Sequence, residues 1–160
     1  MLTRACIPAL FLAAGPAFGA DQPLRLSDAD TVVVKADEAR ESDARDAFEF
    51  SGNIQIHAPE WAILADRAEL IGRIENPDQV IVEGKPARIR VKVNDGKKTI
   101  EGQSDRVEYD RRNDAVRLSG TALLDDDGKV INSGMIEYFL DKRLFRTGGG
   151  KRVRVIATPK

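Results

Sequence analysis

The sequence has 160 residues, the usual size of a single domain. Its 25 basic and 26 acidic side chains give a formal net charge of −1, and they are interspersed along the chain without the basic stripe that nucleic-acid binding requires. The only cysteine, Cys6, lies in an N-terminal leader, so we expect neither disulfides nor thiol chemistry in the mature protein.

Residues 1–20 are predicted to be a cleavable signal peptide. Arg4 supplies a basic head, an apolar run follows from Ala5 to Ala14, and Ala17-Phe18-Gly19 places small residues at the positions that a signal peptidase reads. The apolar run is too short to cross a bilayer of about 30 Å. We therefore expect a secreted protein.

Strand patterns dominate from residue 31 onward. Apolar and polar side chains alternate through residues 48–56, 88–93, 116–124 and 152–155. Alternation of period two with one apolar face is typical of half-buried strands. Residues 36–47 are rich in Ala, Glu and Arg and could form a short helix on propensity alone, but the repeat described below favours a strand there.

Clusters of Gly, Pro, Asn and Asp predict turns between the strands. They lie at Asn76-Pro77-Asp78, Asn94-Asp95-Gly96, Arg112-Asn113-Asp114, Asp126-Asp127-Gly128 and Asp141-Lys142-Arg143. The run Asp125 to Gly128 is similar to the start of a calcium loop but lacks the acidic ligand that would close one. We expect it to be a hairpin loop.

An imperfect internal repeat organises the strands. In four places a small residue is followed by Asp or Gly, and an acidic residue comes shortly after. In each unit another glycine lies 15 to 18 residues after that Asp or Gly. The repeats begin at Ala36, Ala65, Ser104 and Ser133, and their glycines are Gly52, Gly84, Gly120 and Gly149. A repeated strand–turn–strand unit indicates stacked β-layers. The glycines are expected where the chain bends sharply or backbones approach closely.

Several segments resemble the OstA-like family of periplasmic lipopolysaccharide-transport proteins. They are Phe50–Ile56, Ile63–Asp66, Glu83–Ala87, Glu108–Asp110, Leu118–Ala122 and Ile136–Tyr138. Each is a common strand or glycine-turn fragment, and the specificity lies in their order and spacing. The resemblance implies an all-β fold, an open twisted β-jellyroll of stacked antiparallel strands, over residues 31–159, with residues 21–30 as an N-terminal extension.

The resemblance also implies a function. It is that of a non-enzymatic bridge subunit in the periplasm of a Gram-negative bacterium, which carries lipopolysaccharide from the inner to the outer membrane and needs no cofactor. The implied partners are lipopolysaccharide, an LptC-like inner-membrane protein, the jellyroll of an LptD-like outer-membrane barrel, and further copies of the chain joined end to end.

An apolar groove is what such a carrier requires. Exposing an acyl chain of about a dozen carbons to water costs on the order of 10 kcal/mol, at roughly 0.8 kcal/mol per CH₂. The inward positions of stacked strands supply a continuous apolar strip, although the same residues would fill the core of any β-protein. The expected groove residues are Phe48, Phe50, Ile54, Ile56, Ile63, Ile89, Val91, Val107, Tyr109, Val116, Leu118 and Ile136.

The first and last strands are expected to be pairing edges for partner strands. Exposed edges are normally blocked by charge or proline, whereas residues 31–35 and 151–157 keep β-branched side chains, which suits strand addition by a partner. The expected edge residues are Thr31, Val32, Val33, Val34, Val153, Arg154 and Val155. The alternative is that Arg and Lys merely protect both edges.

Two other classes of protein stay open. One is a periplasmic β-scaffold or glycan-binding protein with a packed core that binds no lipid. The other is an enzyme such as a β-helix polysaccharide lyase, which needs acids and bases clustered on one face. The only histidine, His57, shares the polar parity of Gln55, and no Cys/His set has zinc-ligand spacing.

Overall fold

The computed structural model describes residues 31–42, 46–93 and 97–157. The predicted signal peptide (1–20), the extension (21–30) and the predicted turn at 94–96 lie outside these residues. The described part contains no helix that could span a membrane. Its strands are β1 (Val33–Lys35), β2 (Glu38–Ser42), β3 (Ala47–His57), β4 (Trp61–Arg73), β5 (Asn76–Val93), β6 (Lys98–Asp110), β7 (Ala115–Asp126), β8 (Lys129–Phe139), β9 (Leu144–Gly148) and β10 (Arg154–Ala157).

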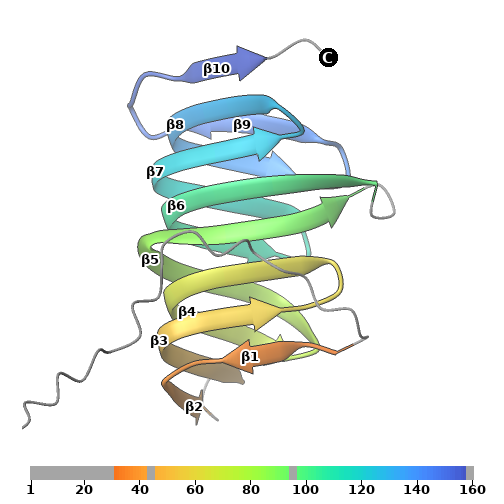
Figure 1. The fold of residues 1–160 in the computed structure, drawn as a ribbon, viewed down its shortest axis with the longest axis vertical. Coiled ribbons are helices and arrows are strands. Elements are labelled where there is room, and N and C mark those ends of the chain that lie inside the picture. The colour runs from red at the N-terminus through yellow and green to blue at the C-terminus, as the bar shows by residue number, and fades with distance from the viewer. Residues whose placement is uncertain (1–30, 43–45, 94–96, 158–160) are drawn as a thin grey trace, which may run out of the picture.

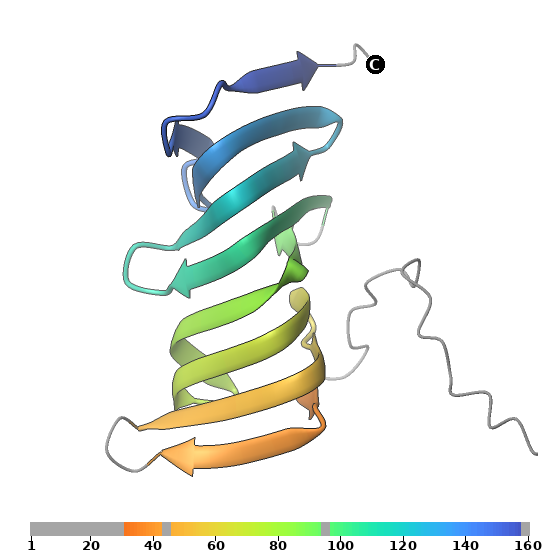
Figure 2. The ribbon, with the colours of Figure 1, turned by 90° about the vertical axis from the view of Figure 1, so that its left-hand side faces the viewer.

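The strands form one antiparallel sheet that stacks in chain order. Its order is β1-β3-β4-β5-β6-β7-β8-β10, with β2 paired to β3 and β9 paired to β8. Successive strands wind around a common long axis, from β2 at one end to β10 at the other (Figure 1). The turned view shows the same stack of open layers (Figure 2). The predicted open β-jellyroll of antiparallel strands is confirmed.

Each long strand bends near its middle, so the sheet has two facing halves. Half A contains β2, β9 and residues 47–51, 67–71, 79–83, 106–110, 115–119 and 135–139. Half B contains β1, β10 and residues 54–57, 61–64, 87–93, 98–103, 122–126 and 129–133. The pairing register shifts at the bends of β3 to β8, as β-bulges do.

The internal repeat marks these bends. At the first, the carboxylate of Asp37 accepts a hydrogen bond of 2.8 Å from the side chain of Asn53, next to Gly52 with φ +76°. At the third, Oδ2 of Asp105 accepts a bond of 3.2 Å from the backbone N–H of Thr121, next to Gly120 with φ +99°. The expectation that the repeat glycines lie at sharp bends is confirmed at these positions.

The small residues of the repeat face the inside of the bends. Ser104 is fully buried, and its hydroxyl donates a 2.7 Å hydrogen bond to the carbonyl of Arg106. Ser133 is also buried and donates to the carbonyl of Gly148. A hydroxyl buried there without a partner would be costly, and both hydrogen bonds avoid that cost.

The core fills the space between the two halves. Its buried members come from β3 to β8 and include Ile56, Leu70, Leu118, Leu124, Ile131 and Ile136. The period-two patterns at residues 48–56, 88–93 and 116–124 therefore had the correct parity. The pattern at residues 152–155 did not predict a half-buried strand correctly, because β10 pairs only with β8 at the end of the stack and both of its faces are exposed. Burial of this continuous apolar layer is the main term that stabilises the fold, at about 25 cal/mol per Å² of apolar surface.

Two local predictions are settled by the strand bounds. Residues 38–42 form strand β2, so the helix that propensity allowed for residues 36–47 is not present in the described part of that segment. The turn predicted at Asn76-Pro77-Asp78 was placed too late, because the turn is at Ile74–Glu75 and β5 already begins at Asn76. Pro77 fits in a strand here because it pairs with Gly72 at a register shift.

The bend at Gly120 predicts a large cost for an added methyl group. A Cβ on Gly120 would lie 2.7 Å from the Cβ and Cγ of Asp105, and φ is +99°. Gly128 has a similar φ of +90° but nothing within 4 Å of its added Cβ. Gly128→Ala should therefore cost only the backbone strain, about 1 kcal/mol, and Gly120→Ala about 2 kcal/mol or more beyond that. Urea unfolding of both variants measures the difference, and equal costs would contradict the close approach at the bend.

Candidate functional site

A cavity of about 590 Å³ lies along the open seam, where the strand ends of half A meet those of half B. Each long strand has a bend near its middle and a turn at each end. The turns, and the seam between them, therefore lie on the side opposite the bends. The volume is typical of sites that hold a small molecule. The apolar lining comes from both halves and consists of Val32, Ala58, Pro59, Trp61, Ile63, Pro77, Val80, Ile89, Val91, Val93, Tyr109, Val116 and Leu140.

In half B, the lining of the cavity ends before the C-terminal third of the molecule. Among the described residues, its half-B lining comes from Val32 before β1, the loop between β3 and β4, and strands β4 and β5, and extends no further along the chain than Val93. Its half-A lining reaches the turn after β8, at Leu140 and Asp141. The cavity therefore runs obliquely across the seam, over the strands from β3 to β8.

Charged side chains surround the mouth of the cavity, and most of them are acidic. They are Glu60, Glu75, Asp114, Asp141 and Lys92. Burial raises the pKa of Asp114, and the neighbouring charge of Asp141 raises it further, while a hydrogen bond from the backbone of Asp141 opposes both. The mouth is thus a place where two carboxylates repel each other.

Tyr109 places a polar group at the same mouth. Its ring is half-buried against the core, and burial raises the pKa of its hydroxyl, with a further increase from the charge of Asp114. The hydroxyl therefore stays protonated at neutral pH. An apolar ring with a polar tip suits the boundary between an apolar interior and water.

The twelve predicted groove residues all belong to or pack against one apolar core, but only some line the cavity. Ile63, Ile89, Val91, Tyr109 and Val116 line it. The others lie away from it, with Phe48 half-buried and the remaining six buried: Phe50, Ile54, Ile56, Val107, Leu118 and Ile136.

Several residues that line the cavity are absent from the groove residues expected from the sequence. Val80 and Val82 are both buried in β5 with Ile81 between them, so the period-two pattern could have identified Val80. Trp61 begins strand β4, and Leu140 lies in the turn after β8, where no periodic pattern applies. Val32, predicted as an edge residue, lines the cavity from the segment before β1.

The two ends of the stack are open strand edges. Val33 and Val34 lie in edge strand β1, and Arg154 and Val155 lie in edge strand β10, whereas Thr31, Val32 and Val153 lie just outside these strands. The exposed large apolar side chains of the described residues gather in or beside the terminal strands. They are Val33, Leu144, Val153, Val155 and Ile156.

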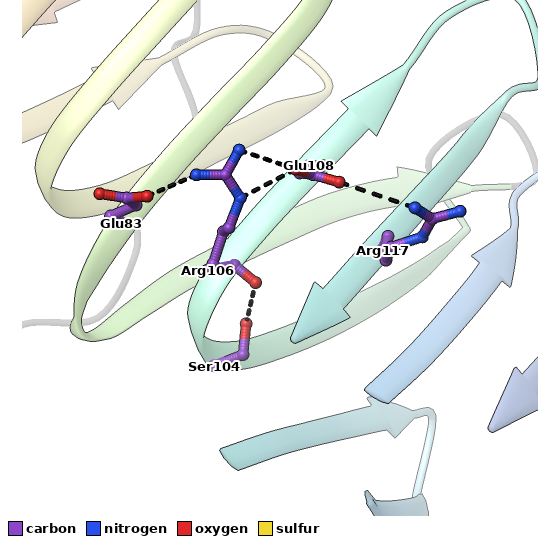
Figure 3. Close-up of polar contacts among 5 residues, drawn as sticks. All are labelled: Glu83, Ser104, Arg106, Glu108 and Arg117. Atoms are coloured by element: carbon purple, nitrogen blue, oxygen red, sulfur yellow. Dashed lines mark hydrogen bonds and ion pairs between the residues drawn. The ribbon is translucent and has the colours of Figure 1, made fainter. Parts of the chain in front are cut away.

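The outer face of half A carries a ladder of opposite charges, whose members on β5, β6 and β7 are drawn in Figure 3 and which continues to Glu137 on β8. Arg106 pairs with Glu83 and donates a 2.8 Å hydrogen bond to Glu108, and Arg117 donates one of 2.9 Å to Glu137. Arg117 also lies 3.9 Å from Glu108. The charges neutralise one another, and exposed pairs of this kind contribute only about 0–1 kcal/mol each.

The described residues contain no group of three or more His, Cys, Asp or Glu that could hold a metal ion. Asp127 and Gly128, in the segment similar to a calcium loop, form a tight turn with φ of +54° and +90°. Asp125 accepts a 2.8 Å hydrogen bond from the backbone N–H of Gly128. The prediction of a hairpin loop is confirmed.

Comparison with known proteins agrees with this geometry. The family model described as LptA/(LptD N-terminal domain) LPS transport protein matches residues 33–143. Among solved structures, the chain is similar to LptH of Pseudomonas aeruginosa, described as the LptA homologous periplasmic component of the conserved lipopolysaccharide transport device, with a TM-score of 0.71. The two share 19% identity over 81% of this chain and 96% of that chain, a likeness that shows the fold. No curated protein matches the sequence.

Replacing Asp114 by Asn should stabilise the fold at neutral pH. Because the folded-state pKa of Asp114 is raised, its ionised form is disfavoured in the fold, and stability falls as pH rises through that pKa. The side-chain oxygen of Asn can still accept the hydrogen bond from the backbone of Asp141, and Asn tolerates the φ of +44° at this position. We expect a gain below about 1 kcal/mol at pH 7, since the group is partly solvated, and none at pH 3. Thermal melts at both pH values test this, and an equal change at both would contradict it.

Proposed function

The chain belongs to the LptA and LptD N-terminal-domain family of lipopolysaccharide-transport proteins, and we propose that it is a non-enzymatic bridge subunit of the periplasm. In this role the acyl chains of lipopolysaccharide travel in the apolar interior of the jellyroll while the sugars remain outside. The observation that carries the proposal is the 590 Å³ cavity, because it opens to solvent along the seam and is continuous with the core.

The form of the cavity suits a long ligand with an apolar and a polar part. Apolar side chains from both halves line its interior, and four of its five charged lining residues lie in turns or loops that border the seam: Glu60, Glu75, Asp114 and Asp141. An acyl chain inside would be removed from water over most of its length, at about 0.8 kcal/mol per CH₂. A headgroup at the seam would meet water and the polar tip of Tyr109 without passing through the core.

The terminal edges support an end-to-end assembly. β1 and β2 end one side of the stack, β9 and β10 end the other, and each end offers one edge from each half. A partner strand added to such an edge extends both the sheet and the apolar layer beneath it. We propose that an LptC-like partner, an LptD-like partner and further copies of this chain dock in this way.

Photo-crosslinking at matched aromatic positions tests the lipid site. Tyr109 lines the cavity, while Phe139 faces outward from β8, where Lys142 and Arg146 lie over its ring at 5.6 and 5.2 Å. Replacing either residue by p-benzoylphenylalanine keeps an aromatic ring. We expect lipopolysaccharide to be captured at position 109 and, within the background of the assay, not at position 139.

Absence of capture at both positions in the folded protein would contradict the proposal. It would favour a scaffold or glycan-binding protein with a packed core. Equal capture at both positions would also count against it, because that result describes lipid adsorbed to the outer surface.

Charge on the terminal edge tests the assembly. The double variant Val155→Lys/Ile156→Lys places a cation on both faces of β10, a device that prevents edge pairing in natural sheets. We expect association to weaken by about tenfold or more, equivalent to about 1.4 kcal/mol or more. Sedimentation equilibrium measures it, and Thr121→Lys, an exposed site in the middle of β7, controls for added charge. Unchanged association of the double variant would contradict edge docking.

A further inference from the structure

The seam is open over the cavity but closed at the C-terminal third. Two contacts cross it there, both beyond the end of the cavity lining in half B. Arg143, in the turn between β8 and β9 of half A, pairs with Asp126 at the end of β7 in half B. Lys129, at the start of β8 in half B, lies 4.9 Å above the ring of Phe145 in β9 of half A. We call the first contact, together with the hydroxyl of Tyr138 that bonds to Asp126, the latch.

Three side chains form the latch. Nη2 of Arg143 lies 3.6 Å from Oδ1 of Asp126, whose side chain is only 9% exposed. Tyr138, in the core, donates a hydrogen bond of 3.3 Å from its hydroxyl to Oδ2 of Asp126. Burial raises the pKa of Tyr138, and Asp126 raises it further, so this hydroxyl stays a donor at neutral pH.

The latch is incompletely satisfied. Oδ1 of Asp126 and Nε of Arg143 are both buried, and neither has a hydrogen-bond partner within the described residues. Arg143 also has a φ of +53°, which costs a non-glycine residue energy. The side chain of Arg143 is 34% exposed and its buried Nε has no acceptor, so the guanidinium gains from an oxyanion that can accept from two of its donors at once.

The surroundings of Arg143 favour an anion. Lys129 lies at the same crossing of the seam, above Phe145, whereas Lys142 and Arg146 lie over Phe139 on the outer face, and Lys142 pairs with Asp141 at 3.9 Å. The mouth of the cavity is acidic in contrast, with Glu60, Glu75, Asp114 and Asp141 against Lys92. An anionic headgroup on a lipid in the groove is therefore repelled by the acidic lining, and the cations that it can reach at the seam are Arg143 and Lys129.

We propose that Arg143 is the anion-binding residue of the groove: a phosphate group on the lipid headgroup takes the place of Asp126, and this exchange opens the seam over the C-terminal third. The inference rests on the proposed function, since it needs a lipid in the groove. It adds a headgroup site and a route by which the acyl chains reach the interior below β9. Phe145 lies at that position, half-buried beside the core.

The experiment places p-benzoylphenylalanine at position 145, with position 109 in a parallel sample as the cavity reporter. The probes are lipid A with its phosphates and the same lipid after removal of the phosphates. We expect capture at 145 to be about tenfold or more higher with the phosphorylated lipid, the size of a charge-assisted hydrogen bond. Capture at 109 should differ much less between the two lipids.

Two latch variants should act in opposite directions. Asp126→Asn removes the competing carboxylate and should raise capture of the phosphorylated lipid at 145, whereas Arg143→Gln should lower it to the level of the dephosphorylated lipid. Arg143→Lys keeps the charge and should keep part of the preference. Arg112→Gln, an exposed arginine in the turn between β6 and β7, is the control. Circular dichroism establishes that each variant is folded.

Several outcomes would overturn the inference. If both latch variants raise capture at 145 with either lipid, the pair is only a structural clasp. If inorganic phosphate added to the dephosphorylated lipid restores capture, the site recognises free phosphate and not a headgroup. If capture at position 145 does not depend on the phosphates while position 109 captures lipid, the latch proposal is wrong and the proposed function stands. Failure of capture at 109 would instead overturn the proposed function.

Discussion

The bend in the middle of every long strand is the constraint on which the rest of the structure depends. Without it, the strands would form a flat sheet with one apolar face in water. With it, each strand contributes to both walls of the interior, and the core closes between halves A and B. The bends of β3 and β7 require a backbone with positive φ and very little space, which Gly52 and Gly120 provide against Asp37 and Asp105.

Two openings follow from this geometry. The strand ends opposite the bends are joined only by turns within each half, so a seam runs along the molecule, and its cavity lies there. The first and last strands lack a neighbour on one side, so both ends of the stack are pairing edges. A carrier of lipid chains between membranes needs both features: lateral access for the headgroup, and ends that continue the apolar interior into a partner.

The sequence predicted the parity of the strands and the position of the bends, because both are local. Alternation of Ile54 and Ile56 with Asn53 and Gln55 depends only on the pleat, and a positive-φ glycine is marked by its own identity. The cavity could not be predicted in the same way. Its lining joins Trp61 to Leu140, which are brought together only by the curvature of the whole stack.

The latch shows the same limit. Asp126 and Arg143 belong to two turn motifs that the sequence identified correctly, yet nothing local indicates that these turns meet across the seam. Leu118, one of the expected groove residues, shares the inward parity of the cavity lining but is fully buried in the core beside it. Parity separates inside from outside, but only the curvature decides which inward positions border empty space.

The most direct test of the account uses Trp61, the only tryptophan of the chain, which lines the cavity. Its fluorescence is measured while lipopolysaccharide carrying brominated acyl chains is added, since bromine quenches tryptophan only at close range. If the acyl chains lie in the cavity, the brominated lipid quenches the fluorescence in a saturable way and the same lipid without bromine does not. Binding of the brominated lipid without quenching would place the acyl chains outside the cavity and contradict the central claim.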